Sequence, residues 1–426
     1  MTAETREPTT GTVPETDRCP AHFRYWDSAR SPRMQRRVRR IKRLTGFDVF
    51  PTDEQATAFC NDLFAGDPVA ERFVDEVYDA DPAATRAMLG RALDSSLGQV
   101  PDAPESMRAL FREFEEVPDW VDPALVEQGA AIWRRWGTML FTVAGCTTLE
   151  IYTEAAVATP LSLAGGYAGD NALRRFLETS RFWIDVSEPG ALLTPGSRGR
   201  ATAMHVRVMH VNVRRRVADH PEWREEDWGL PISQAYMLLT LIGGSVAPAL
   251  ALWTLGYQTT PSEMRALLHF QRYLGHLLGV RARWYPEGVG DCLRLLAMTI
   301  ASRSYDAGEV GSELVESFPA AFGPRDGQST LQRLRGVYNH RIYSAYTALF
   351  MAPRTRARYD LPNAFPWILI PIVRIPLVTA MELGRRFVPG VAGVQEKISV
   401  RHRLNWYRAQ MQGREAEFQA KSALRR

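Results

Sequence analysis

The chain has 426 residues, of which 45% are hydrophobic and 23% charged, the values of an ordinary globular protein. Its net charge of +4 is too small for a dedicated nucleic-acid-binding protein, whose basic excess is larger and clustered. Four widely separated cysteines form no CxxC or CxxCH motif and no zinc-ligand spacing, so we expect a reducing cytoplasmic environment and no covalently attached haem.

The N-terminal region is polar and lacks the apolar segment of a secretory signal. Its Thr- and Pro-rich composition predicts a disordered tail over residues 1–28, followed by one helical domain over 29–410 and a charged tail over 411–426. Seven of the eleven residues from Arg33 to Arg43 are basic. This run indicates a solvated helix face, with a phosphate- or membrane-surface patch as the alternative.

Apolar residues recur at intervals of three and four along most of the chain, and strand-like alternation is rare. The pattern predicts an all-α protein. Start signals are Asp53, the Asp81–Pro82 pair, Asp170 and either Thr260 or Ser262. The expected helical segments are 53–93 (two or three helices), 124–156 (one long helix or two), 170–190, 200–218, 260–280 and 328–350.

Two apolar stretches are long enough to raise the question of a membrane. Residues 235–256 carry no charge, but Gly243, Gly244 and Pro248 interrupt them, so we expect two buried helices joined by a turn. Residues 365–384 contain three prolines five positions apart. They predict an irregular segment that packs on the core or contacts a membrane surface. Neither stretch is a firm membrane span.

One helix combines a metal ligand with two cations. Arg207, His210 and Arg214 are spaced by three, four and seven residues, which places them on one helix face. A neutral imidazole is a good axial ligand for haem iron, and arginines are natural partners for haem propionates. His205 lies about 140° around the helix from His210, so it would compete as a ligand rather than share one metal ion.

A simpler interpretation of this helix stays open. An apolar stripe runs beside the three residues, and a basic amphipathic helix without a ligand would show the same pattern. The other histidines carry no ligand pattern, and we expect His276 to pack in the core. No GxSxG, HExxH, P-loop or GxGxxG motif is present, which leaves histidine-ligated chemistry as the main enzyme hypothesis. The stripe consists of Val206, Met209, Val213 and Val217.

The order of the segments resembles the catalytic domain of the rubber oxygenases, or latex-clearing proteins. The same domain occurs in the fungal oxygenase that cleaves the farnesyl side chain in mycophenolic acid biosynthesis. The sequence RVMHVNVR fits the R-x-x-H-x-x-x-R haem helix of that family at every defined position. The resemblance covers roughly residues 120–350. Its segments are 153–183, 207–214, 230–260 and 272–288.

The resemblance implies a globin-like helical core that holds a non-covalent b-type haem. His210 would be the proximal iron ligand, and Arg207 and Arg214 would hold the propionates or orient the haem helix. Arg175 and Thr179 match the R-x-x-K-T element of the family, which lies by the haem. Arg341 would match a further family arginine.

The distal side of the haem departs from the family pattern. Glu178 stands where the family has a lysine that can occupy the distal iron position. An open or differently gated distal site is therefore expected. Glu154 is a candidate distal acid or base, with a helix-surface carboxylate as the alternative.

The function that this resemblance implies is O2-dependent cleavage of a carbon–carbon double bond into two carbonyl products. The substrate would be a hydrophobic isoprenoid or lipid-like molecule bound between segments 153–167 and 235–256. Rubber itself is in doubt, because those enzymes are exported and no export signal is evident here. Two alternatives remain: a haem protein without oxygenase turnover (a sensor, carrier or peroxidase-like scavenger), and a haem-free helical scaffold at a membrane surface.

Overall fold

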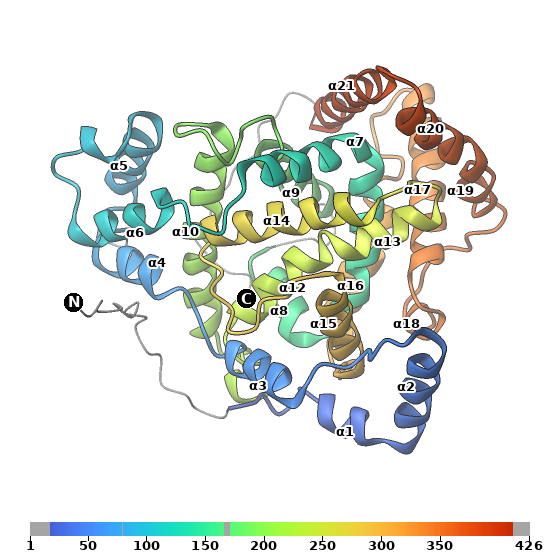
Figure 1. Cartoon of the computed structure of the whole chain (residues 1–426), viewed down its shortest axis with the longest axis horizontal. Helices are drawn as coiled ribbons and strands as arrows, with labels where there is room; N and C mark the ends of the chain where they lie inside the picture. Colours follow the sequence, from blue (N-terminus) through green and yellow to red (C-terminus); the bar gives the residue numbers. More distant parts are fainter. Residues whose placement is uncertain (1–17, 79, 166–170, 412–426) are drawn as a thin grey trace, which may run out of the picture.

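A computed structural model of the chain describes residues 18–78, 80–165 and 171–411. The described residues form helices and no strands, as the periodicity predicts. Figure 1 shows them gathered into one helical assembly. The α-helices are α1 Tyr25–Arg30, α2 Pro32–Thr45, α3 Asp53–Asp62, α4 Pro68–Phe73, α5 Pro82–Ser95, α6 Glu105–Glu115, α7 Pro123–Thr148, α8 Ala155–Leu163, α9 Ala172–Val186, α10 Arg198–Ala218, α11 Glu225–Trp228, α12 Gln234–Gly243, α13 Val246–Thr254, α14 Pro261–Leu277, α15 Val289–Ala301, α16 Gly308–Ala320, α17 Thr330–Phe350, α18 Pro353–Arg356, α19 Leu369–Val373, α20 Ile375–Phe387 and α21 Val391–Met411. Short helices of other types are η1 Val74–Tyr78, η2 Leu97–Gln99 and η3 Leu149–Thr153.

The core is built around α7 and α14, which lie against one another near the middle of the molecule (Figure 1). A Cβ atom on Gly129 would lie 2.4 Å from the carbonyl oxygen of Ala266, so this glycine permits the close approach. The side chain of Asp122 accepts hydrogen bonds from the first turn of α7. Gly137 has a φ of 58° inside α7 and marks a kink between two helical stretches, and the predicted segment 124–156 then ends in η3 and the start of α8.

The uncharged stretch at 235–256 forms two buried helices, as its glycines predict. α12 ends at Gly243, and α13 begins at Val246. The segment Gln234–Thr254 is long and apolar enough to cross a membrane by length and composition, but 67% of it is buried inside the protein. Most of this segment therefore packs inside the helical domain.

Capping residues set several helix starts where the sequence places them. The Asp81 side chain accepts hydrogen bonds from the backbone at the start of α5. Thr260 and Glu263 form a capping box on α14, which decides between Thr260 and Ser262. Thr52 is the cap of α3, which begins at Asp53. The expected cap at Asp170 lies outside the described residues.

The expected N-terminal tail needs correction where the structure describes it. Residues 1–17 lie outside the described part, but α1 begins at Tyr25, whose side chain is buried. Cys19 and Cys60 form a disulfide, although they are 41 positions apart. No spacing rule in the sequence signals this pair. The cytoplasmic location expected from the cysteine pattern stays a prediction.

The proline-rich stretch at 365–384 is also more regular than expected. α19 and α20 are helices separated only at Arg374, not an irregular segment. Pro376 lies in the first turn of α20, where a proline needs no backbone donor and its fixed φ suits a helix. The basic run Arg33–Arg43 falls on α2, which has no buried residue, as expected for a solvated helix face.

Candidate functional site

α10 carries the predicted ligand and packs against α4, α5, α8, α9 and α14. In Figure 1 it runs beside the left end of α14, with α4 to α6 on its outer side. Ser197 caps its N-terminus by accepting a hydrogen bond from the amide of Arg200. The helix holds twelve buried residues over its 21 positions, so it is a core element rather than a surface helix.

Arg207 binds protein carboxylates through two of its three guanidinium nitrogens, whereas Nη1 is buried and has no hydrogen-bond partner among the described residues. Its Nε lies 2.7 Å from Asp67 Oδ2 and its Nη2 2.9 Å from Asp67 Oδ1, a bidentate pair. Nη2 also donates to Glu113 at 2.6 Å. Burial alone would lower the pKa of Arg207, but the charges of Asp67 and Glu113 outweigh burial and raise it. Arg207 is 1% exposed and is charged at every relevant pH.

Arg214 is anchored in the same way on α4. Nη1 donates to Glu71 at 2.9 Å, and the other guanidinium nitrogens donate to the carbonyls of Pro231 and Ile232. Burial lowers the pKa of Arg214, against the charge of Glu71, which raises it. The two arginines therefore tie α10 to α4 and to the segment before α12. Of the two roles expected for them, this geometry matches orientation of the helix rather than binding of propionates.

His210 lies between the two anchored arginines and has no protein partner. No hydrogen bond or ion pair in the described part of the chain involves its ring, and Nδ1 is buried and unpartnered. Burial, and after it the charge of Arg214, lowers its pKa to about 4, against the charge of Asp67, which raises it. The side chain nevertheless keeps some accessible surface. At neutral pH it is a neutral imidazole with a free lone pair, which is the form that binds a metal.

The R-x-x-K-T positions lie on α9, which packs against α10. Arg175 Nη1 pairs with Glu178 Oε2 at 2.8 Å, one turn along the helix, and Arg175 Nη2 donates to the Ala164 carbonyl at the end of α8. Glu178 is buried, and Arg174 Nε lies 3.9 Å from its other oxygen. Thr179 is exposed. Glu178 is thus neutralised by arginines rather than free to act as a base.

Glu154 and Arg341 have surroundings that differ from the expected roles. Glu154 precedes α8, and its carboxylate accepts hydrogen bonds from the amide and hydroxyl of Ser304 and from the hydroxyl of Thr153. The Glu154 carboxylate thus holds the loop after α15 in place. These contacts favour a structural role for Glu154 over that of a distal acid or base. Arg341 is exposed on α17, a helix that packs on α7, α16 and α19. No contact joins either residue to His210.

The other histidines of this region lie in different surroundings, although Nε2 of His276 is also buried without a hydrogen-bond partner among the described residues. Nε2 of His269 accepts a hydrogen bond from the Asp122 amide at 2.8 Å. The His276 ring stacks on Tyr273, as expected for a packed side chain. Burial lowers the pKa of His205, which lies on a different face of α10. His210 is therefore the histidine whose surroundings best fit a ligand.

Sequence analysis missed the residues that hold α10 in place. Asp67 caps α4 through its Oδ1, which accepts from the Ala70 amide, and also binds Arg207. The side-chain amide of Gln234 donates to the carbonyls of Gly66 and Gly279 and so joins three segments beside this pair. The Asp67–Pro68 dipeptide carries the same helix-start signal as Asp81–Pro82 and was available in the sequence. The pairing of Asp67 with Arg207, 140 positions away, could not be predicted from the sequence.

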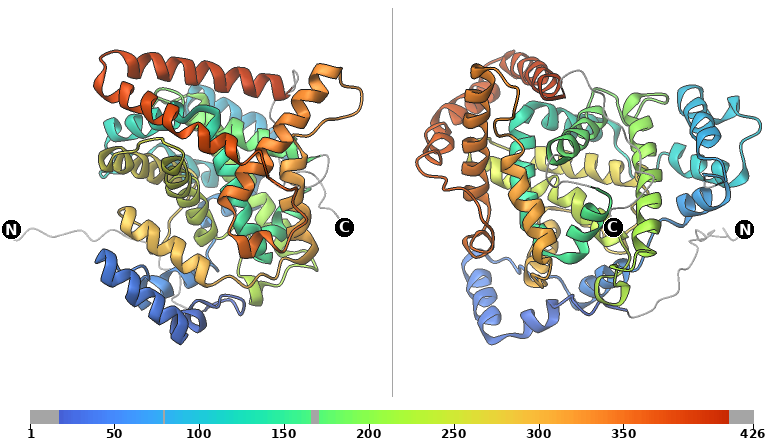
Figure 2. Two further views of the ribbon diagram at one scale, coloured as in Figure 1. Left: turned by 90° about the vertical axis from the view of Figure 1, so that its right-hand side faces the viewer. Right: turned by 180° about the vertical axis from the view of Figure 1, so that it is seen from behind.

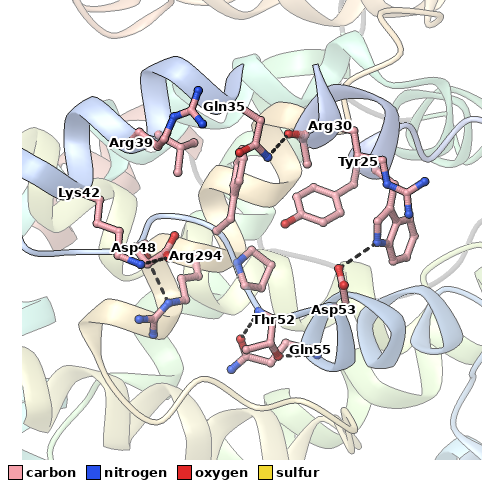
Figure 3. A pocket seen from close by; sticks show the side chains of 15 residues that line it. Tyr25, Arg30, Gln35, Arg39, Lys42, Asp48, Thr52, Asp53, Gln55 and Arg294 are labelled. Carbon is pink, nitrogen blue, oxygen red and sulfur yellow. Dashed lines mark hydrogen bonds and ion pairs between the residues drawn. The ribbon is translucent and has the colours of Figure 1, made fainter. Parts of the chain in front are cut away.

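A second feature lies away from α10. An open groove of about 770 Å³ runs between α1, α2, α3 and α15 (Figure 3). Lys42 pairs with Asp48 at 2.8 Å, and Arg294 donates to the Asp48 carbonyl at 3.1 Å, so the labelled charges largely bind one another. None of the predicted site residues lines this groove. We therefore place the candidate site at His210.

The chemistry of the donor set limits which metal group fits. Within the described ranges no group of three or more His, Cys, Asp or Glu side chains is arranged to hold a metal ion. Haem supplies four nitrogen ligands itself and needs only one axial ligand from the protein. The unpartnered, neutral imidazole of His210 fits that requirement. The geometry therefore fits haem better than a metal ion held by side chains alone.

Comparison with known proteins agrees with the fold and the sequence pattern. Residues 130–374 match the family described as ER-bound oxygenase mpaB/B′/rubber oxygenase, catalytic domain. A rubber oxygenase from Streptomyces sp. (strain K30) is 25% identical over 187 residues, which are 43% of this chain and 45% of that protein. The aligned part therefore spans less than half of that relative. The structure of latex clearing protein LCP in the closed state has a TM-score of 0.60 and 20% identity, covering 80% of this chain and 91% of that one. The two share a fold.

Proposed function

The chain belongs to the family of the ER-bound oxygenases mpaB/B′ and rubber oxygenases, and from this premise we propose that it is a haem b-dependent oxygenase. It uses O2 to cleave a carbon–carbon double bond in a hydrophobic isoprenoid or lipid-like substrate. The observation that carries the proposal is the imidazole of His210, which is neutral, has no hydrogen-bond partner among the described residues and lies between two anchored arginines.

A haem held by His210 would supply the iron that binds and activates O2. Residues of the chain would supply the iron ligand and hold it in position. His210 provides a lone pair at neutral pH because burial keeps its pKa near 4. The ion pairs of Arg207 with Asp67 and of Arg214 with Glu71 fix the rotation of α10, and therefore the direction of that lone pair. A ligand on a rigid element is held more accurately than one on a loop.

The surroundings of α10 suit an apolar substrate. Val213 and Val217 pack with Ala155, Ala156 and Tyr236, which brings α8 and α12 against this part of α10. The hydroxyl of Tyr236 is kept protonated, because burial and the negative charges of Glu154 and Asp306 raise its pKa. A neutral phenol beside aliphatic side chains excludes water without adding charge, which favours binding of an alkene.

A haem protein without oxygenase turnover remains the second candidate function. The observation that favours it is Glu178, which stands at the family's lysine position and is bound to Arg175. A carboxylate held by an arginine cannot replace a neutral amine on iron. The two candidates agree on haem and differ only in whether bound O2 is consumed.

The test starts with the visible spectrum of the full chain purified from haem-supplemented cells. A Soret band that shifts on reduction with dithionite supports haem binding, and a colourless preparation contradicts both candidates. Oxygen uptake is then followed with squalene, an isoprenoid alkene, and with squalane, its saturated analogue. Uptake and carbonyl products with squalene alone support the oxygenase. A red protein that consumes no oxygen with squalene or with shorter isoprenoids supports the second candidate.

A further inference from the structure

α19 and α20 turn an apolar side toward solvent. Side chains spaced along one side of these two helices are between 47% and 77% exposed, although all are large and hydrophobic. Figure 2 (left) looks onto this region, where α19, α20 and α21 lie at the front of the molecule. We call these residues the apolar face. They are Leu369, Val373, Leu377, Met381, Phe387 and Val388.

The polar side of α20 points into the protein. Glu382 is 0% exposed, and Arg385 Nη2 lies 3.2 Å from its Oε2. The same carboxylate oxygen accepts a hydrogen bond from the Gln258 amide, and the other lies 3.9 Å from Arg135 Nε. A surface helix of a soluble protein does the reverse and buries its apolar stripe. The ion pairs of Glu382 hold α20 in this orientation. The apolar face therefore belongs to the ordered fold and does not result from fraying of a helix end.

Positive charge surrounds the apolar face. Residues 329–401 contain eleven Lys and Arg but three Asp and Glu, a net charge of +8, whereas the whole chain carries +4. The rest of the molecule is therefore acidic. Arg374 and Arg386 are exposed within the helices, and α18 with its following turn adds three more exposed arginines. These three are Arg354, Arg356 and Arg358.

The basic helix α2 extends this pattern. It lies on the same side of the molecule as α18, below α19 and α20 in Figure 1, and it is at the front of the left panel of Figure 2. It has no buried residue, and its basic run is unopposed by any acidic residue between Pro32 and Thr45. An apolar strip and a cationic surround thus share one side of the protein.

We propose that this side docks peripherally on an anionic phospholipid bilayer, with the apolar face inserted among the acyl chains and the arginines at the phosphate groups. Apolar insertion combined with basic residues is the arrangement by which amphipathic helices bind the membrane surface. The proposal concerns the surface alone and does not depend on haem or on oxygenase activity. It gives a partner to an apolar surface that the fold leaves exposed to solvent.

Charge distinguishes this partner from a second copy of the chain. A two-fold symmetric dimer would place the same surface on both sides of the interface. Regions of net charge +8 would then meet one another, and like charges at an interface are unfavourable. Anionic lipid headgroups are complementary to the same region. Self-association is therefore an outcome that the experiment must separate from lipid binding.

The test measures co-sedimentation of the full chain with vesicles of phosphatidylcholine alone and of phosphatidylcholine with 30% phosphatidylglycerol. We expect binding to the anionic vesicles that weakens with salt. The double variant Leu377→Gln/Phe387→Gln should bind at least about tenfold more weakly, since each substitution removes an exposed apolar side chain that would be buried among the acyl chains. Val117→Gln is the matched control, because Val117 is 53% exposed in the loop after α6, away from this side. It should bind like the unsubstituted protein.

Circular dichroism and light scattering accompany the binding assay. Glutamine is a good helix former, so both variants should keep the helical spectrum. No binding to anionic vesicles overturns the proposal, as does equal binding of the double variant and the control. A dimer in solution that the double variant converts to a monomer, without vesicle binding by the original protein, also overturns it and assigns the face to self-association.

Discussion

Arg207 on α10 and Asp67 at the start of α4 form a buried bidentate ion pair across 140 positions of sequence, with N–O distances of 2.7 and 2.9 Å. The same Asp67 caps α4. One carboxylate therefore fixes both the start of α4 and the rotation of the helix that carries His210. The candidate ligand is positioned by charges that do not themselves touch the ligand-binding nitrogen.

Removal of the Asp67 charge should destabilise the fold strongly. Asp67→Asn leaves a buried guanidinium with only Glu113 as a charged partner, and loss of one member of a buried pair costs about 3–5 kcal/mol. Because Glu113 remains, we expect the lower end of this range in urea unfolding. Asp75→Asn is the matched control, since its pair with Arg215 is exposed and worth less than about 1 kcal/mol. Equal losses in the two variants would contradict the role of Asp67.

His210→Ala should abolish haem binding while leaving the helical fold intact. The haem-to-protein ratio, measured as the pyridine haemochrome, should fall to background. His205→Ala is the control, because His205 is on the same helix but on another face, and it should keep its haem. Glu178→Gln should also keep it, since Glu178 pairs with Arg175 and is not a ligand. Full haem content in the His210 variant would show that the ligand assignment is wrong.

Gly279→Ala should perturb the same ion pair from a third direction. A Cβ at Gly279 would lie 2.1 Å from Asp67 Oδ2 and 2.6 Å from Arg207 Nε, and its φ of +77° disfavours any side chain. We expect a loss of about 3 kcal/mol in unfolding free energy, from strain and a displaced buried pair. Gly288→Ala, whose Cβ would meet nothing within 4 Å, should change it by less than about 0.5 kcal/mol. An unchanged free energy of unfolding in Gly279→Ala would mean that the Asp67–Arg207 pair can shift without loss of stability.

His276 should make stability fall on the acid side of neutrality. Burial, and then the charge of Arg281, lowers its pKa to about 4 from an ordinary value of 6.5. The unfolded chain then binds a proton first, so the stabilising contribution is complete above pH 6.5 and is lost as the pH falls toward 4. Because the ring is only partly buried, we expect a loss of about 1–2 kcal/mol rather than the full value of the shift.

The comparison of pH 7 with pH 4.5 by urea unfolding isolates this contribution. Many carboxylates also titrate in this range, so the informative quantity is the difference between the original protein and His276→Gln. The variant should lose less stability than the original protein between the two pH values. An identical loss in both would show that the proton on His276 is not excluded by the fold.

The local pattern of α10 was sufficient to predict its helix and the shared face of Arg207, His210 and Arg214. The all-α class and the buried pair α12 and α13 followed from periodicity and from the glycines at the break. The partners of Arg207 and Arg214 could not be predicted in this way, because ion pairs across 140 positions leave no periodic signal in the sequence. For the same reason the sequence left open whether the two arginines hold propionates or orient the helix, and it did not indicate Asp67 and Glu71 as their partners.

Two further features, the regularity of α20 and the Cys19–Cys60 disulfide, were not predicted from the sequence. The prolines near α20 suggested irregularity, yet Pro376 occupies the first turn, the one place where a helix accepts it. The Cys19–Cys60 disulfide escaped notice because a single long-range pair has no motif. Neither the solvent around α19 and α20 nor the distant cysteine partner is encoded by neighbouring residues.

The redox state of the cysteines depends on the compartment in which the protein folded. Cys146 and Cys292 are buried, and burial raises the pKa of each thiol to about 12, so neither reacts readily with an alkylating reagent in the native state. Cys19 and Cys60 are joined when oxidised, but Cys19 is exposed once the bond is reduced. The number of thiols alkylated in the intact protein, read by mass, therefore records whether the chain matured in an oxidising or a reducing compartment.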